Sequence, residues 1–147
     1  MPQSKTEFYY HFVWATWQRN ALVTEGIERR LYRCIAGEVL KLKGTMLEIN
    51  GMPDHIHLVV QLPGTVAPSK LMQAAKGVSS TFARAQLTPG EFFGWQDGYA
   101  GFTVSRQNLQ TVINYVRNQK RHHADNTTIP DWEDCGGIDE DRRQTEE

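Results

Sequence analysis

The stretch Met52-Pro53-Asp54-His55-Ile56-His57-Leu58-Val59-Val60-Gln61-Leu62 combines a turn with a strand. Proline and aspartate favour a turn, and the apolar, β-branched run that follows them is typical of a strand. Side chains of a strand alternate between its two faces. His55 and His57 therefore share one face, whereas Ile56 and Leu58 share the other. The strand presents two imidazoles side by side opposite an apolar surface.

Further strand-like and helix-like segments surround this strand. Aromatic and β-branched runs predict strands at 8–16, 46–50, 55–62 and 99–104, and apolar residues at helical spacing predict helices at 25–43, 68–85 and from 106 to at least 119. Gly44 is expected to end the first helix and Ser105 to cap the third. This order predicts an α+β fold of the ferredoxin-like or RRM-like class. Its antiparallel sheet would have about four strands, with helices on one face and a C-terminal tyrosine-bearing helix.

The 147 residues have a net charge of only -1, but the basic and acidic residues are unevenly distributed along the chain. Residues 1–123 carry 14 Lys and Arg against 8 Asp and Glu, whereas residues 124–147 carry 2 against 9. We therefore expect one globular domain at 1–123 and an acidic, partly disordered tail at 124–147, with too few apolar residues to fold alone. A basic body favours a polyanionic partner, although charge runs are more often solvated faces.

The termini and cysteines give little sign of export. The N-terminal residues 1–5 lack a hydrophobic signal core, and no apolar run approaches the ~18 residues of a membrane span, which predicts a cytoplasmic protein. Cys34 and Cys135 lie far apart and outside any CxxC pattern, so a disulfide is not expected.

The paired histidines are the first candidate site. Two imidazoles on one face of a strand can offer two nitrogens to a single cation. The alternative is that two half-exposed histidines merely alternate with core residues, because a bare HxH pattern also arises by chance.

Tyr115 and Gln119 are the second candidate. Residues four apart lie one turn above the other on a helix, here at the edge of an apolar stripe. The alternative is an amphipathic tyrosine that packs its ring and exposes its hydroxyl. A phenol with a pKa of ~10 is a poor nucleophile at neutral pH and needs a cation nearby. His55, His57 and Gln119 could hold such a divalent metal, Mg²⁺ or Mn²⁺, and imidazole suits Mn²⁺ better.

With these motifs the sequence resembles the single-tyrosine HUH transposases of bacterial insertion sequences, the IS200-like family, including their repeat-associated tyrosine relatives. HUH denotes histidine, a hydrophobic residue and histidine, here His55-Ile56-His57. The tyrosine helix of the family is similar to residues 115–119, followed by the basic run 120–123. Further similar stretches are Phe12-Val13-Trp14-Ala15-Thr16, Lys76-Gly77-Val78-Ser79-Ser80, and Trp95 with residues 98–105.

The resemblance implies an activity. Tyr115 would cut single-stranded DNA at hairpin-marked element ends through a 5′-phosphotyrosine, and a 3′-hydroxyl would then rejoin the strands without a nucleotide cofactor. It also implies a homodimer, and leaves open whether Tyr115 serves its own chain or its partner. We name five basic residues as candidate DNA contacts: Lys76 and Arg84 on the second predicted helix, and Arg117, Lys120 and Arg121 near the tyrosine.

Two features depart from the family pattern. Trp17-Gln18-Arg19-Asn20 replaces a more basic run after the first strand, and the acidic tail has no counterpart. A domesticated, non-catalytic protein that binds hairpin DNA or RNA therefore remains an alternative, as does a hydrolytic metal-dependent nuclease. The tail could also fold over the basic body and compete with DNA, or simply extend into solvent.

Overall fold

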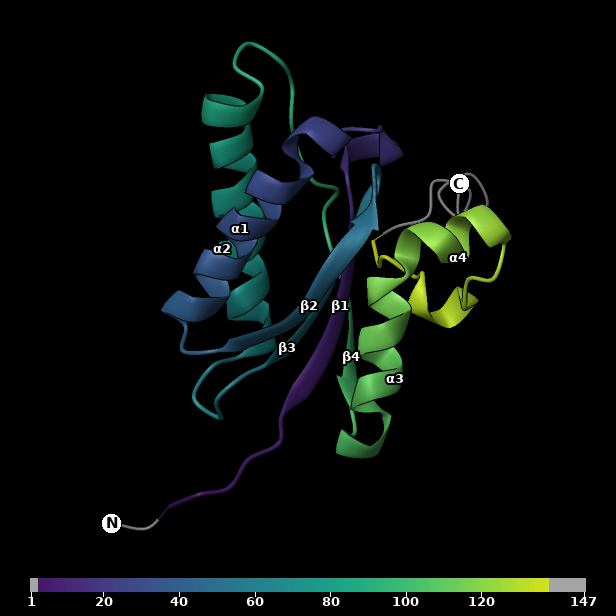
Figure 1. Cartoon of the computed structure of the whole chain (residues 1–147). Coiled ribbons are helices and arrows are strands. Elements are labelled where there is room, and N and C mark those ends of the chain that lie inside the picture. The colour runs from purple at the N-terminus through teal and green to yellow at the C-terminus, as the bar shows by residue number, and fades with distance from the viewer. Residues whose placement is uncertain (1–2, 138–147) are drawn as a thin grey trace, which may run out of the picture.

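The computed structural model describes residues 3–137 as a four-stranded antiparallel sheet covered by helices on both faces (Figure 1). The strands lie in the order β2-β3-β1-β4. Their bounds are β1 (Tyr9–Ala15), β2 (Thr45–Met52), β3 (His55–Gln61) and β4 (Ala100–Val104). β1 and β3 thus form the centre of the sheet. The residues beyond Gly137, part of the tail that we expected to be partly disordered, lie outside the described part of the chain.

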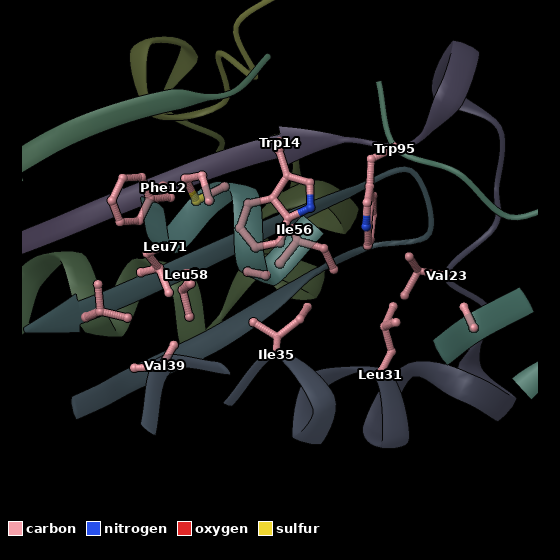
Figure 2. Close-up of a cluster of buried hydrophobic side chains, with 14 of the residues drawn as sticks. Phe12, Trp14, Val23, Leu31, Ile35, Val39, Ile56, Leu58, Leu71 and Trp95 are labelled. Atoms are coloured by element: carbon pink, nitrogen blue, oxygen red, sulfur yellow. The ribbon is translucent and has the colours of Figure 1, made fainter. Parts of the chain in front are cut away.

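Two long helices cover the first face of the sheet. α1 (Glu25–Lys41) and α2 (Pro68–Phe82) lie side by side there (Figure 1). α2 continues into a short π-helical segment, Ala83–Leu87. The main core fills the space between these helices and the sheet, and its residues include Phe12, Trp14, Leu31, Ile35, Ile56, Leu58 and Leu71 (Figure 2). Burial of this apolar surface is the main source of stability for the fold.

α3 (Arg106–Arg117) packs on the opposite face of the sheet (Figure 1). Val112 and Val116 of this helix join Val59 of β3 in a second, smaller core. The alternation in β3 explains both cores, since Ile56 and Leu58 point to α1 and α2 while His55, His57 and Val59 point toward α3. The face that carries the histidines is therefore covered by the tyrosine helix.

The expected α+β class, the four strands and the N-cap at Ser105 are confirmed. The side chain of Ser105 accepts a hydrogen bond from the amide of Asn108 (3.3 Å). The prediction of one unbroken helix through Gln119 is wrong, because the chain leaves helical geometry at Asn118 (φ -100°, ψ 23°) and a second helix, α4 (Gln119–Asp125), begins there. The Asn118 side chain donates to the Asn114 carbonyl (2.8 Å), a competition with the helix that is common for asparagine.

After α4 the chain turns back over the α3 face. Asn126 adopts the left-handed conformation (φ 56°) that often ends a helix. A short 3-10 turn, η3 (Pro130–Trp132), follows and returns the chain to the sheet beside α4 (Figure 1). Among the described residues, none of the helices is both long and apolar enough to span a membrane.

Candidate active site

β3 and its neighbours fix the paired histidines. His55 and His57 are both buried, and in the sheet they pair with Ala15 and Val13 of β1. On the other side, β2 approaches β3 so closely at Gly51 that a Cβ atom there would lie 2.2 Å from the His55 carbonyl oxygen. The strand that carries the histidines is therefore held by its backbone on both edges. The alternative of two half-exposed histidines does not describe this chain.

Each imidazole is oriented through its Nδ1 atom. His57 Nδ1 shares a hydrogen bond with His11 Nε2 (2.9 Å), and His55 Nδ1 lies 2.7 Å from Asp54 Oδ1. Partners of this kind fix the ring orientation and tautomer of metal-binding histidines. Both Nε2 atoms consequently face the same point between β3 and the C-terminal segment.

The charges of these imidazoles differ. Burial works against protonation of His55, but the Asp54 and Glu133 carboxylates outweigh it and raise its pKa to about 9. Burial lowers the pKa of His57, and it also lowers the pKa of His11 to about 3 with the help of His57. His11 is therefore neutral at physiological pH and suited to hold His57 by a hydrogen bond.

Tyr115 lies in the last turn of α3 with only 4% of its surface exposed. Its ring stacks on His122 (centroids 4.7 Å apart) and meets Trp132 edge-on (5.1 Å). Its hydroxyl donates to Glu133 and accepts a hydrogen bond from the backbone amide of Ile129 (2.9 Å). Burial and the adjacent Glu133 carboxylate raise the pKa of Tyr115 to about 12. In this state the phenol is protonated and covered.

Gln119, the first residue of α4, is fully buried between these groups. Its Oε1 lies 3.2 Å from His55 Nε2, and its Nε2 donates to Glu133 Oε1 (2.8 Å). The break at Asn118 does not separate it from Tyr115, since both side chains contact the same carboxylate. The structure thus brings Tyr115, His55, His57 and Gln119 together from three elements.

Glu133, which the sequence did not single out, lies at the centre of this group. Its Oε2 is 3.0 Å from His57 Nε2 and 3.1 Å from His55 Nε2. Burial alone would raise the pKa of Glu133, but hydrogen bonds from the two histidines hold it far below the usual range. An acidic residue in a tail of charged residues gives no sign in the sequence that it lies in the site.

Two further histidines, which the sequence did not single out, contact the site. His11 supports His57 as described above, and its place on β1, an odd number of residues from the core residues Phe12 and Trp14, is the signal that puts it on the His57 face. His123 Nε2 lies 3.1 Å from Gln119 Oε1 and 3.4 Å from Glu133 Oε2.

The donor atoms fit a divalent cation. One ligand atom from each of His55, His57 and Glu133 lies within 4.8 Å of the others. Two imidazoles and one carboxylate are a set that first-row divalent ions accept, with positions left for further oxygen ligands. The Gln119 amide oxygen lies beside this cluster.

The five basic residues named as DNA contacts lie in two places. Lys76 donates to the Gln96 and Gly98 carbonyls (both 2.8 Å) and Arg84 to the Phe93 carbonyl (3.0 Å), on the α2 side of the molecule. Near the site, Arg117 and Lys120 form ion pairs with Glu48 (2.9 Å) and Glu28 (2.6 Å). Arg121 is exposed on α4. The structure therefore gathers three of the five around Tyr115 and leaves Lys76 and Arg84 on the far face.

Comparisons with known proteins show the family and the fold of the chain. No curated protein matches the chain by sequence. Among solved structures, a Deinococcus radiodurans R1 protein assigned as a transposase is similar, with 21% identity, a TM-score of 0.62, and 81% of this chain and 96% of that chain covered.

A REP-associated tyrosine transposase bound to a REP hairpin is similar too, with 15% identity, a TM-score of 0.62, and 84% and 74% of the two chains covered. At these identities both structures support the fold. The family model described as "Transposase IS200 like" matches residues 4–119, which include the paired histidines, Tyr115 and Gln119. The chain therefore belongs to the IS200-like transposases, the single-tyrosine DNA transposases.

Proposed function

We propose that this transposase cuts and rejoins single-stranded DNA through a 5′-phosphotyrosine on Tyr115. The observation that carries the proposal is the convergence of the Tyr115 hydroxyl, the His55 and His57 Nε2 atoms and the Gln119 amide around one carboxylate. A carboxylate held by such donors occupies a place suited to the oxygens of a scissile phosphate.

His55, His57 and Gln119 would hold a divalent ion, Mg²⁺ or Mn²⁺. When bound, that ion would supply positive charge that polarises the phosphate and favours the phenolate form of the tyrosine. The roles of His11 and Asp54 are to keep the two Nε2 atoms aimed at this position.

The covalent steps balance without a nucleotide cofactor. Tyr115 Oη loses its proton and forms a bond to phosphorus, the P–O3′ bond breaks, and the 3′-oxygen takes up a proton and leaves as a hydroxyl. In the second step a 3′-hydroxyl attacks the phosphotyrosine and releases Tyr115. The phosphodiester energy is kept in the enzyme-linked intermediate.

We propose hairpin-marked DNA ends as the substrate, with Arg117, Lys120 and Arg121 as phosphate contacts beside the site. The solved relative bound to a REP hairpin supports this substrate class. Lys76 and Arg84 would contact DNA on the α2 side. The transposase domain would span 1–123 and receive Glu133 from the segment that follows it. It would act in the cytoplasm and pair as a homodimer when two DNA ends are joined, as the family resemblance implies.

The test uses labelled single-stranded oligonucleotides that carry imperfect palindromes from the DNA flanking the gene. We expect SDS-resistant protein–DNA adducts in Mn²⁺ or Mg²⁺ that disappear in Tyr115→Phe and persist in Tyr9→Phe, a tyrosine at the opposite end of β1 from the site. Hairpin binding without adducts in the wild-type chain would instead favour a non-catalytic binding protein. Strand cleavage that survives Tyr115→Phe would favour a hydrolytic nuclease.

A further inference from the structure

The Glu133 side chain contacts four polar groups of the site, which an acidic residue in a solvent-exposed tail would not do. Oε2 faces His55 and His57 Nε2 at 3.1 and 3.0 Å, while Oε1 receives the Tyr115 hydroxyl and the Gln119 amide (2.8 Å). The side chain keeps only 16% of its surface exposed. Each oxygen thus contacts a different pair of the groups assigned to metal binding and attack.

The chain on both sides of Glu133 is fastened to the domain. Before it, Trp132 packs edge-on against Tyr115 and His11 (5.1 and 6.2 Å between centroids). After it, Cys135 Sγ lies 2.9 Å from Arg19 Nη1. Gly136, with a φ of 68°, runs so close to Tyr99 that a Cβ atom would lie 2.3 Å from the Tyr99 carbonyl oxygen. The position of Glu133 is therefore set by packing as well as by charge.

The chemistry of the contact indicates a cation between the groups. Two imidazole Nε2 atoms and a carboxylate oxygen pointing at one another are a ligand set for a first-row divalent ion. A carboxylate is a stronger ligand for such an ion than the neutral amide of Gln119, because it brings a full negative charge. A phosphate oxygen of DNA would bring the same charge to the same place.

Building on the proposed function, we propose that Glu133 is a metal ligand in the DNA-free protein and gives up its position to the scissile phosphate when DNA binds. The ion is then held by His55, His57 and Glu133 before substrate arrives, and by the two histidines, Gln119 and DNA afterwards. The acidic segment 128–135 is thereby a part of the active site, and it competes with the substrate for one ligand position.

The first test measures Mn²⁺ binding to the full-length, DNA-free protein by calorimetry. We expect Glu133→Gln and Glu133→Ala to weaken Mn²⁺ binding by at least about tenfold, a loss typical even of partners outside the metal's first coordination sphere. Asp131→Asn, which removes an exposed charge from the same segment, should bind Mn²⁺ like the wild type. Unchanged affinity in both Glu133 variants would overturn the proposal.

His57→Ala separates this inference from the proposed function. If His57→Ala abolishes Mn²⁺ binding while Glu133→Gln leaves it intact, the metal site stands and the role of Glu133 is wrong. If neither change alters Mn²⁺ binding, the metal site itself is wrong.

The second test measures affinity for a single-stranded oligonucleotide at saturating Mn²⁺. If the Glu133-bound form makes up ~90% of the DNA-free protein, the wild-type chain should bind about tenfold more weakly than Glu133→Gln. Asp131→Asn should again match the wild type. Equal affinities for all three proteins would show that Glu133 does not compete with DNA.

Discussion

His11 fixes the orientation of the His57 ring, because it is the hydrogen-bond partner of the His57 Nδ1 atom inside the sheet. His11→Phe keeps an aromatic ring of similar shape and removes the nitrogen. We expect this change to weaken Mn²⁺ binding about 10- to 100-fold, the usual cost of losing a second-sphere partner. Calorimetry measures the affinity, and circular dichroism checks that the variant is folded. Wild-type affinity in a folded His11→Phe protein would show that the sheet alone orients His57.

Glu133 controls the acidity of Tyr115. Burial raises the pKa of Tyr115, and the neighbouring carboxylate raises it further, to about 12, because a negative charge disfavours the phenolate. Glu133→Gln removes that charge, so the pKa of Tyr115 should fall toward 10.0, the ordinary value of a tyrosine. In chelator, a pH titration of ¹³C-tyrosine NMR signals, assigned with Tyr115→Phe, follows the change. The phenolate then appears at lower pH in the variant, and an unshifted titration would contradict this account.

For individual residues, the sequence predicts those members of the candidate site that have a characteristic residue type and spacing. His55 and His57 follow from strand alternation, and Tyr115 and Gln119 follow from helical spacing and the family resemblance. Glu133 could not be predicted in this way, since its role depends on a loop that returns from α4 to the sheet. Local periodicity carries no information about such a tertiary contact.

Among the secondary-structure elements, the β2–β3 hairpin contains a glycine, Gly51, that leaves no room for a side chain. Gly51→Ala would place a methyl group against the His55 backbone, which must shift. We expect a loss of about 1–3 kcal/mol in the free energy of unfolding, as for other overpacked sites, together with weaker metal binding. Chemical denaturation measures the first effect and calorimetry the second.

Gly37→Ala is the matched control within α1. A Cβ atom at Gly37 meets nothing within 4 Å, and alanine favours a helix over glycine by about 0.8–1.0 kcal/mol. This variant should be slightly more stable than the wild type. Equal stability of the two glycine variants would refute the close approach at Gly51.

The elements also show where prediction from sequence fails. The strands and α1 have long, regular patterns, and the structure matches them within a few residues. The break at Asn118 could not be predicted, because a single asparagine in an amphipathic pattern is compatible with a continuous helix. Only the side-chain hydrogen bond to Asn114 and the packing of α4 on β2 favour the break.

For the molecule as a whole, the contacts of the candidate site lie within one described chain. Tyr115 and His57 both contact the Glu133 side chain of the same polypeptide. A mixture of Tyr115→Phe and His57→Ala proteins should therefore show no adduct above the sum of the two variants alone. Adduct yield on gels after co-refolding measures this. Recovery of a large fraction of wild-type yield would mean that the tyrosine of one protomer serves the histidines of the other.

The arrangement of the tyrosine and the histidines within one polypeptide has a consequence for how the rates of DNA nicking and joining would depend on protein concentration. Under the proposed function, nicking by a self-sufficient protomer would be first order in enzyme, whereas joining of ends carried by two protomers would be second order. At low protein concentration, most DNA elements would then be nicked and resealed in place. Movement of an element to a new site would become frequent only when the protein is concentrated enough for two protomers to meet.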